Sequence, residues 1–211
     1  MSKRPNVLPL HRLEGLTDGI FAIAMTLMVL GLPLPEAHHN IGSDDDLLNH
    51  LLEYSELFWT YALSFLLLGY FWINQQKLFK YVNNTCTHHL WTNLGELLLV
   101  CVIPFSSGLI GDHLNYFTAS FIFHMNILLI GVFFLFQCTL LLRFPDILKK
   151  DVSRKAAMRI VKINLVVPIL AVTGILIALF SPPWSLVVYV LAPFLTSIIA
   201  KRTKHVLGDL T

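Results

Sequence analysis

Apolar residues gather in six long stretches of the chain, separated by shorter polar connections. The stretches cover residues 12–34, 57–76, 90–110, 116–142, 156–180 and 184–200. Each is close to the ~20 residues that an α-helix needs to cross the hydrocarbon core of a bilayer. The pattern predicts an all-α integral membrane protein with six transmembrane helices, organised as a single domain over residues 1–211.

The cationic residues fall on one side of this topology. All 15 Lys and Arg residues lie before or at the start of the first stretch, in the connections around 77–90 and 143–162, or after residue 200. The connections at 35–56, 111–115 and 181–183 contain none. Because cytoplasmic loops carry the excess of Lys and Arg, we expect both termini in the cytoplasm and a multi-pass protein of the plasma membrane.

Composition narrows the function further. The chain is 55% hydrophobic and 13% charged, and its formal net charge of +2 is too small to favour a nucleic-acid partner. An intramembrane enzyme needs a nucleophile with its base or a metal motif such as HExxH, and the sequence has neither. The pair His38-His39 is more typical of a loop than of a metal site. We therefore expect no enzyme activity, resident metal or cofactor.

The connection after the first stretch contains Ser43 followed by three aspartates, Asp44 to Asp46, and an apolar run. A Ser N-cap with acids in the first turn is typical of a helix start, which predicts that helix 2 begins near residue 44. A second interpretation adds Glu36, Glu53 and Glu56 and sees an acidic collar that concentrates cations at an external pore mouth. The two interpretations are compatible.

The first helix carries an aliphatic stripe. Its members recur at the spacing of one helix face and are Leu16, Ile20, Ile23, Leu27 and Leu30. Small residues beside the stripe, Gly15, Gly19, Ala22 and Ala24, would permit close helix approach in a membrane. The spacing alone is also that of an ordinary packing seam, so both interpretations stay open at this point.

Asp18 lies inside the first stretch, where a carboxylate is costly and is usually paired, buried in a bundle or exposed to a wet path. We interpret it as a structural anchor, with a proton relay as the alternative. The possible hydrogen-bond donors at similar depth are Arg12, Trp72, Asn74, His88, His89 and Asn93. Arg12 in turn needs an acidic neighbour, either Glu14 or Asp18 of the same or a neighbouring chain, unless it extends into the lipid headgroups.

The segment Arg12-x-x-x-Leu16-Thr17-Asp18-Gly19, followed by Ile20-Phe21-Ala22-Ile23-Ala24-Met25-Thr26-Leu27, resembles the first-helix signature of the transmembrane protein 175 potassium channels, which reads Arg-x-x-x-Phe-Ser-Asp. Leu16 and Thr17 depart from that pattern but keep its apolar and hydroxyl character. The stretches 72–79 and 93–105 are also similar to that family, and the resemblance extends over the six-helix length.

The resemblance implies a prokaryotic channel with one six-helix unit per chain, assembled as a homotetramer with the first helices around a central pore. It implies that Ile23, Leu27 and Leu30 form apolar rings at the constriction and that Thr26 forms a hydroxyl layer. It also implies a structural network of Arg12, Thr17, Asp18, Trp72 and Asn93. The chain has no Thr-Val-Gly-Tyr-Gly filter, so modest potassium selectivity over sodium would arise at these side chains, with membrane lipids and permeant cations as the other partners.

Two alternatives remain, a secondary transporter and a proton-conducting membrane protein. A transporter would normally contain paired, interrupted helices and a polar site at mid-membrane, and neither is evident. The remaining polar residues of the spans are expected to make interhelical hydrogen bonds, with Glu96 either joining Asp18 or facing the cytoplasmic boundary. These residues are Glu96, His124, Asn126 and Gln137. The cationic cluster 143–162 is expected to set topology and to contact anionic lipid.

Overall fold

The computed structural model describes residues 8–32, 43–144, 147–149 and 154–207. Predicted features at Glu36, at His38-His39 and at Lys3 and Arg4 lie outside the described residues. Within them, six helical segments are long and apolar enough to cross a membrane, which confirms the predicted number of spans. They are Leu10–Leu30, Ser55–Tyr81, Thr87–Asp112, Phe117–Arg143, Met158–Ala178 and Pro183–Arg202.

The first four spans correspond to single helices, and a short helix precedes the second. These elements are α1 (Leu10–Val29), α2 (Asp44–Glu53), α3 (Ser55–Tyr81), α4 (Thr87–Asp112) and α5 (Phe117–Arg143). The side chain of Ser43 accepts a hydrogen bond from the backbone N–H of Asp46, which confirms the predicted N-cap. Helix α2 ends at Glu53, and α3 begins at Ser55 as a separate element.

The last two spans are interrupted, which the apolar pattern did not predict. The fifth consists of α6 (Arg154–Asn164) and α7 (Val166–Ala178), and the sixth of a 3₁₀ segment η2 (Pro183–Leu191) and α8 (Ala192–Leu207). Proline has no backbone N–H, so Pro168 cannot donate to the carbonyl one turn before it. The side chain of Asn164, at the end of α6, donates to the Ile160 carbonyl of its own helix at 2.8 Å. Pro193 has the same effect where η2 gives way to α8.

The described residues are not purely helical. Two-residue strands β1 (Leu8–Pro9) and β2 (Asn84–Thr85) pair antiparallel, with Leu8 opposite Thr85. This small ladder ties the segment before α1 to the connection between α3 and α4. The all-α fold class holds for the membrane-spanning part of the protein.

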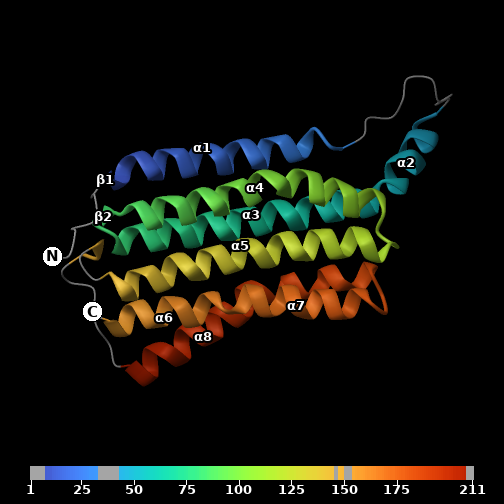
Figure 1. Cartoon of the computed structure of the whole chain (residues 1–211). Coiled ribbons are helices and arrows are strands. Elements are labelled where there is room, and N and C mark those ends of the chain that lie inside the picture. Colours follow the sequence, from blue (N-terminus) through green and yellow to red (C-terminus); the bar gives the residue numbers. More distant parts are fainter. Residues whose placement is uncertain (1–7, 33–42, 145–146, 150–153, 208–211) are drawn as a thin grey trace.

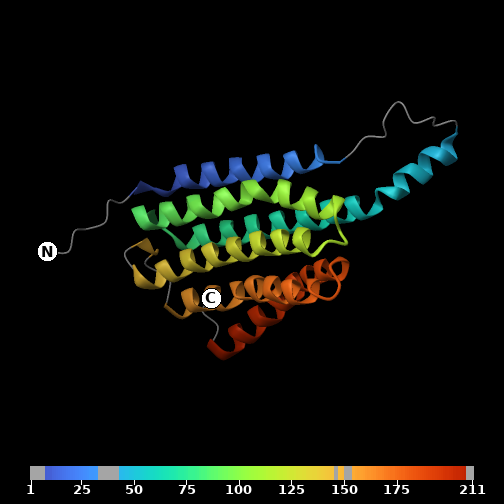
Figure 2. The ribbon, with the colours of Figure 1, turned by 45° about the vertical axis from the view of Figure 1, so that its right-hand side comes forward.

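The helices form one elongated bundle in which α1 lies at an edge (Figure 1). Helix α1 packs against α4 and α3, while α5 packs against α4 on one side and α7 and α6 on the other. The rotated view shows the same order, with α1 and the C-terminal helices on opposite sides of the bundle (Figure 2). Because α1 has helices behind it on one side alone, the other side of α1 is free within the protomer.

The described cationic residues lie at the end of the bundle where α1 begins and α5 ends, as the sequence predicts (Figure 1). Arg12 is in the first turn of α1, Lys80 is in the last turn of α3 and Arg143 is in the last turn of α5. The opposite end carries the acidic first turn of α2, Asp44 to Asp46. The bundle therefore has one cationic end and one acidic end.

Candidate functional site

One face of α1 is buried in the bundle. Its buried residues recur every three or four positions and are Leu13, Thr17, Phe21, Ala24 and Met28. Phe21 and Met28 belong to the main apolar core, together with residues of α3, α4 and α5. This spacing is the one that places side chains on a single helix face, so the contacts with the bundle fix the rotation of α1 about its axis.

The opposite face of α1 presents the predicted aliphatic stripe to the outside of the protomer. Ile23 is 59% exposed, Leu27 is 47% exposed and Leu30 is 78% exposed. Leu16 is also exposed, whereas Ile20 is partly buried and packs against the core. Ile20 therefore lies on the side of the stripe that turns toward the bundle.

Thr26 lies on the exposed side of α1, next to Ile23. Its hydroxyl donates a hydrogen bond to the Ile23 carbonyl oxygen at 2.9 Å. A hydroxyl that uses its proton in this way keeps oxygen lone pairs for another ligand. The side chain of Thr26 therefore offers an acceptor, the type of atom that a cation binds.

The two glycines of α1 do not support close helix packing inside the protomer. A Cβ atom added at Gly15 or at Gly19 would meet nothing within 4 Å, so no helix of the same protomer approaches closely there, and an approach by a helix of another copy stays a prediction. Both residues are exposed, as is Ala22, while Ala24 is buried. Small side chains thus widen the free face of α1 instead of joining α1 to α3 or α4.

Asp18 is held by α3. It accepts hydrogen bonds from the indole N–H of Trp72, at 2.8 Å, and from the side-chain amide of Gln76. The first partner was among the predicted donors and the second was missed. Gln76 lies four residues after Trp72 and so shares its helix face, a signal that could have revealed it. Asp18 and Trp72 are at the protomer surface, where they clamp the start of α1 to α3.

Thr17, the neighbour of Asp18, enters a separate and buried polar cluster. Its hydroxyl donates to the side-chain oxygen of Asn93 at 3.2 Å, and the Asn93 amide donates to Gln137. Gln75 also donates to Gln137, at 3.0 Å, and Gln137 donates to Glu96. We call these residues the Glu96 cluster: Thr17, Gln75, Asn93, Glu96 and Gln137. It joins α1, α3, α4 and α5.

The Glu96 cluster corrects two expectations. Glu96 neither joins Asp18 nor faces the boundary, because it is fully buried against Gln137 of α5. Asn93 bonds Thr17 and not Asp18. Gln75 was not predicted as a member, since the pair Gln75-Gln76 does not by itself indicate which neighbour each side chain meets.

Arg12 is exposed at the beginning of α1. Within the described part of the chain it makes no ion pair with Glu14 or Asp18. The expectation of a buried acidic partner in the same chain is therefore wrong, and a partner from another copy stays a prediction. Of the five residues of the predicted network, four form two pairs, Thr17 with Asn93 and Asp18 with Trp72.

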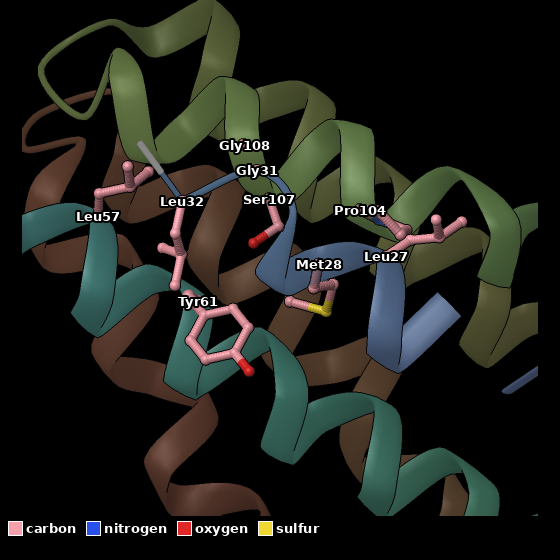
Figure 3. A pocket seen from close by; sticks show the side chains of 9 residues that line it. All are labelled: Leu27, Met28, Gly31, Leu32, Leu57, Tyr61, Pro104, Ser107 and Gly108. Atoms are coloured by element: carbon pink, nitrogen blue, oxygen red, sulfur yellow. The ribbon is translucent and has the colours of Figure 1, made fainter. Parts of the chain in front are cut away.

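A small pocket of about 30 Å³ lies behind the other end of α1. Met28 of α1, Tyr61 of α3 and Ser107 of α4 line it (Figure 3). The Ser107 hydroxyl is already bonded to that of Ser64 at 2.8 Å. This volume holds one or a few water molecules, so the pocket is no binding site for a larger solute.

Other polar residues of the spans make the predicted interhelical bonds. His124 of α5 bonds Tyr189 and Ser185 of η2, and Asn126 donates to Ser106 of α4. We call the first group the His124 cluster: His124, Ser185 and Tyr189. All three side chains are buried. A serine beside a histidine resembles a nucleophile with its base, but no solute reaches this one.

Comparison with known proteins shows which proteins this chain is similar to in sequence and in fold. The model of the family described as endosomal/lysosomal potassium channel TMEM175 matches residues 12–104, from the Arg12 motif through the second span and into α4. A solved structure, that of a lysosomal potassium-selective channel TMEM175 homolog from Chamaesiphon minutus, superposes with a TM-score of 0.76. It is 25% identical and covers 90% of this chain and 97% of its own. Residues 12–104 are thus similar to the TMEM175 family, and the fold of the chain is similar to that of a TMEM175 homolog.

Two curated potassium channels are also similar to part of this chain. A potassium channel of Streptomyces collinus is 31% identical over 104 residues, which are 49% of this chain and 48% of the relative. A potassium channel of Chamaesiphon minutus is 31% identical over 114 residues, 54% of this chain and 55% of the relative. The match thus spans about half the length of these curated relatives. All are named as channels and not as enzymes.

A second solved structure agrees in fold. It is that of a variant of the potassium channel MtTMEM175 in complex with a nanobody fusion protein, with a TM-score of 0.61 over 98% of this chain at 15% identity. The two proteins are therefore similar in fold at low sequence identity.

Proposed function

We propose that this protein is a potassium channel whose pore is enclosed by α1 helices from several copies of the chain. The observation that carries the proposal is the exposed aliphatic face of α1, formed by Ile23, Leu27 and Leu30. The potassium channels among its relatives support the same function. A secondary transporter or a proton-conducting protein is the alternative.

A single α1 cannot surround a path, so the function requires an oligomer. By resemblance to the family we propose a homotetramer. Within one protomer, the free face of α1 has open space at Gly15 and Gly19, which leaves room for the equivalent helices of other copies. Arg12, unpaired with an acid in its own described chain, would meet its acidic partner across that interface.

The physical mechanism follows from the side chains. Rings of Ile23, Leu27 and Leu30 form an apolar constriction that excludes water when it is narrow and conducts when it widens. Potassium holds its hydration shell less tightly than sodium and so crosses more readily. The Thr26 oxygen, with its proton given to the Ile23 carbonyl, replaces some of the lost water. The resulting preference for potassium is modest, because hydroxyls form a weaker cage than rings of carbonyls.

Two anchors at the start of α1 give the constriction a fixed base. Thr17 bonds Asn93, and Asp18 bonds Trp72, so the start of α1 is attached to α4 and α3. The other end of α1 lies over the small pocket near Met28 and Tyr61. Movement of α1 is therefore easier at that end than at the anchored start.

The orientation follows from charge. We propose that the cationic end of the bundle, with Arg12, Lys80 and Arg143, faces the cytoplasm of a cell whose plasma membrane holds the protein. The acidic end, with Asp44 to Asp46, Glu53 and Glu56, would then face outward and raise the concentration of cations at the pore mouth.

The test is ion flux into sealed vesicles that contain the purified protein, with potassium and sodium compared. Ile23→Ser should raise potassium flux several-fold and reduce the preference over sodium, because a hydroxyl keeps the constriction wet. Ile169→Ser on α7 is the matched control, since Ile169 has the same exposure of 59%. Its flux should equal that of the unchanged protein.

Two results would contradict the proposal. Equal fluxes through the Ile23→Ser and Ile169→Ser proteins would remove Ile23 from the conduction path. Movement of potassium that requires a second solute gradient would make the protein a transporter. Thr26→Val tests selectivity in the same assay, with loss of potassium preference expected and the total flux retained.

A further inference from the structure

A second and larger hollow lies at the cationic end of the bundle, away from α1. It has a volume of about 600 Å³, within the range of sites that hold small molecules. It lies between the start of α4 and the end of α5. Its walls are formed by His88, Phe136, Thr139, Leu140, Leu142, Arg143 and Phe144. We call it the Arg143 groove.

The groove crosses the level at which a membrane changes from hydrocarbon to headgroups. Arg143 is in the last turn of the α5 span, so its guanidinium lies at the headgroup level. Phe136 is seven residues earlier, which is about 10 Å deeper along a helix, and it is 55% exposed. One hollow thus joins a cation at its mouth to an exposed apolar surface below.

The polar groups of the groove suit an anion. Arg143 is exposed and, among the described residues, has no carboxylate partner. Among the residues that the structure describes, no acidic side chain lines the groove. The imidazole of His88 stacks on the ring of Phe144, with ring centroids 6.0 Å apart, and this pair forms a wall beside Arg143. The guanidinium can bind a phosphate through two parallel N–H donors.

We propose that the Arg143 groove binds an anionic phospholipid, with the phosphate on Arg143 and an acyl chain along Phe136 and Leu140. A soluble phosphate would use the mouth alone and leave the apolar wall exposed. A lipid covers both parts, and basic pockets between transmembrane helices at the cytoplasmic side are suited to such headgroups. The site is separate from the proposed pore, because no residue of α1 lines it.

The proposal is tested by native mass spectrometry of the full-length protein with added phosphatidylglycerol or phosphatidylcholine. The unchanged protein should retain phosphatidylglycerol preferentially. Arg143→Gln should weaken phosphatidylglycerol binding about five- to tenfold, the range expected for removal of one cation at the membrane surface. Arg202→Gln is the control, since it removes an exposed cation at the same end of the bundle, on α8, and should leave the affinity unchanged.

A second variant separates a lipid from a free anion. Phe136→Ala should weaken phosphatidylglycerol binding while Arg143 stays in place. Equal retention of phosphatidylglycerol by the Arg143→Gln and Arg202→Gln proteins would overturn the site. Displacement of the lipid by millimolar inorganic phosphate, or no effect of Phe136→Ala, would overturn the lipid as its occupant. Lipid binding is read independently of ion flux, so failure here is distinct from failure of the proposed channel.

Discussion

Two polar clusters are buried in this apolar bundle, and they differ in how completely their hydrogen bonds are satisfied. In the His124 cluster, the two ring nitrogens of His124 bond Tyr189 at 2.7 Å and Ser185 at 2.8 Å. Ser185 donates its proton to the Pro182 carbonyl, so its oxygen accepts from Nε2–H of His124. Nδ1 then accepts from the Tyr189 hydroxyl, and every group has a partner.

The Glu96 cluster has surplus acceptors. One carboxylate oxygen of Glu96 and the side-chain oxygen of Gln75 have no partner although both are buried. An unsatisfied buried acceptor is costly, and a donor such as a proton or a water molecule relieves that cost. The comparison indicates that the His124 cluster holds α5 rigidly to η2, whereas the Glu96 cluster can accept a further donor.

The largest expected effect comes from breaking the satisfied cluster. His124→Ala should lower the free energy of unfolding by about 3 kcal/mol, because it leaves a cavity and strands the hydroxyl of Tyr189. Thermal unfolding in detergent measures the loss. A loss below about 1 kcal/mol would mean that the cluster does not hold α5 firmly to η2.

The close packing around the His124 ring gives the second prediction. A Cβ atom at Gly174 would lie 2.5 Å from Cε1 of His124, so Gly174→Ala should cost about 1–3 kcal/mol of unfolding free energy. Gly108→Ala is the matched control, since a Cβ atom there meets nothing within 4 Å. Equal stability of the two variants, measured by the same thermal unfolding, would contradict the packing.

The Glu96 cluster should respond less to an equivalent change. Glu96→Gln keeps the shape of the side chain and adds a donor among surplus acceptors, so we expect a change in unfolding free energy within about 1 kcal/mol. The measurement is again thermal unfolding, beside His124→Ala. A loss as large as that of His124→Ala would remove the contrast between the clusters.

The smallest effect is expected at the link from this cluster to α1. Thr17→Val removes one hydrogen bond to Asn93, which in a membrane is worth about 0.6 kcal/mol. Asn93 keeps its bond to Gln137. Thr173→Val is the control, because the Thr173 hydroxyl bonds only the Ile169 carbonyl of its own helix. A greater loss in the control would mean that the interhelical bond contributes nothing.

Local signals in the sequence predicted much of the candidate site. The helix N-cap at Ser43 and the bond from Trp72 to Asp18 were both expected. The burial of Ile20, the role of Gln76 and the isolation of Glu96 from Asp18 were not. Each of these depends on the rotation of one helix against another, which no short motif specifies.

The sequence by itself determined the six spans, the single cationic end and the family motif at Arg12 to Asp18, because segment length, charge and residue type are local properties. The tertiary structure decided which face of α1 is free and which polar residues meet inside the bundle. Helical periodicity fixes the angles between side chains on one helix, as for Ile23 and Thr17. It does not fix the rotation of that helix against its neighbours. For α1 this rotation is set by the packing of Phe21 and Met28 against α3 and α4.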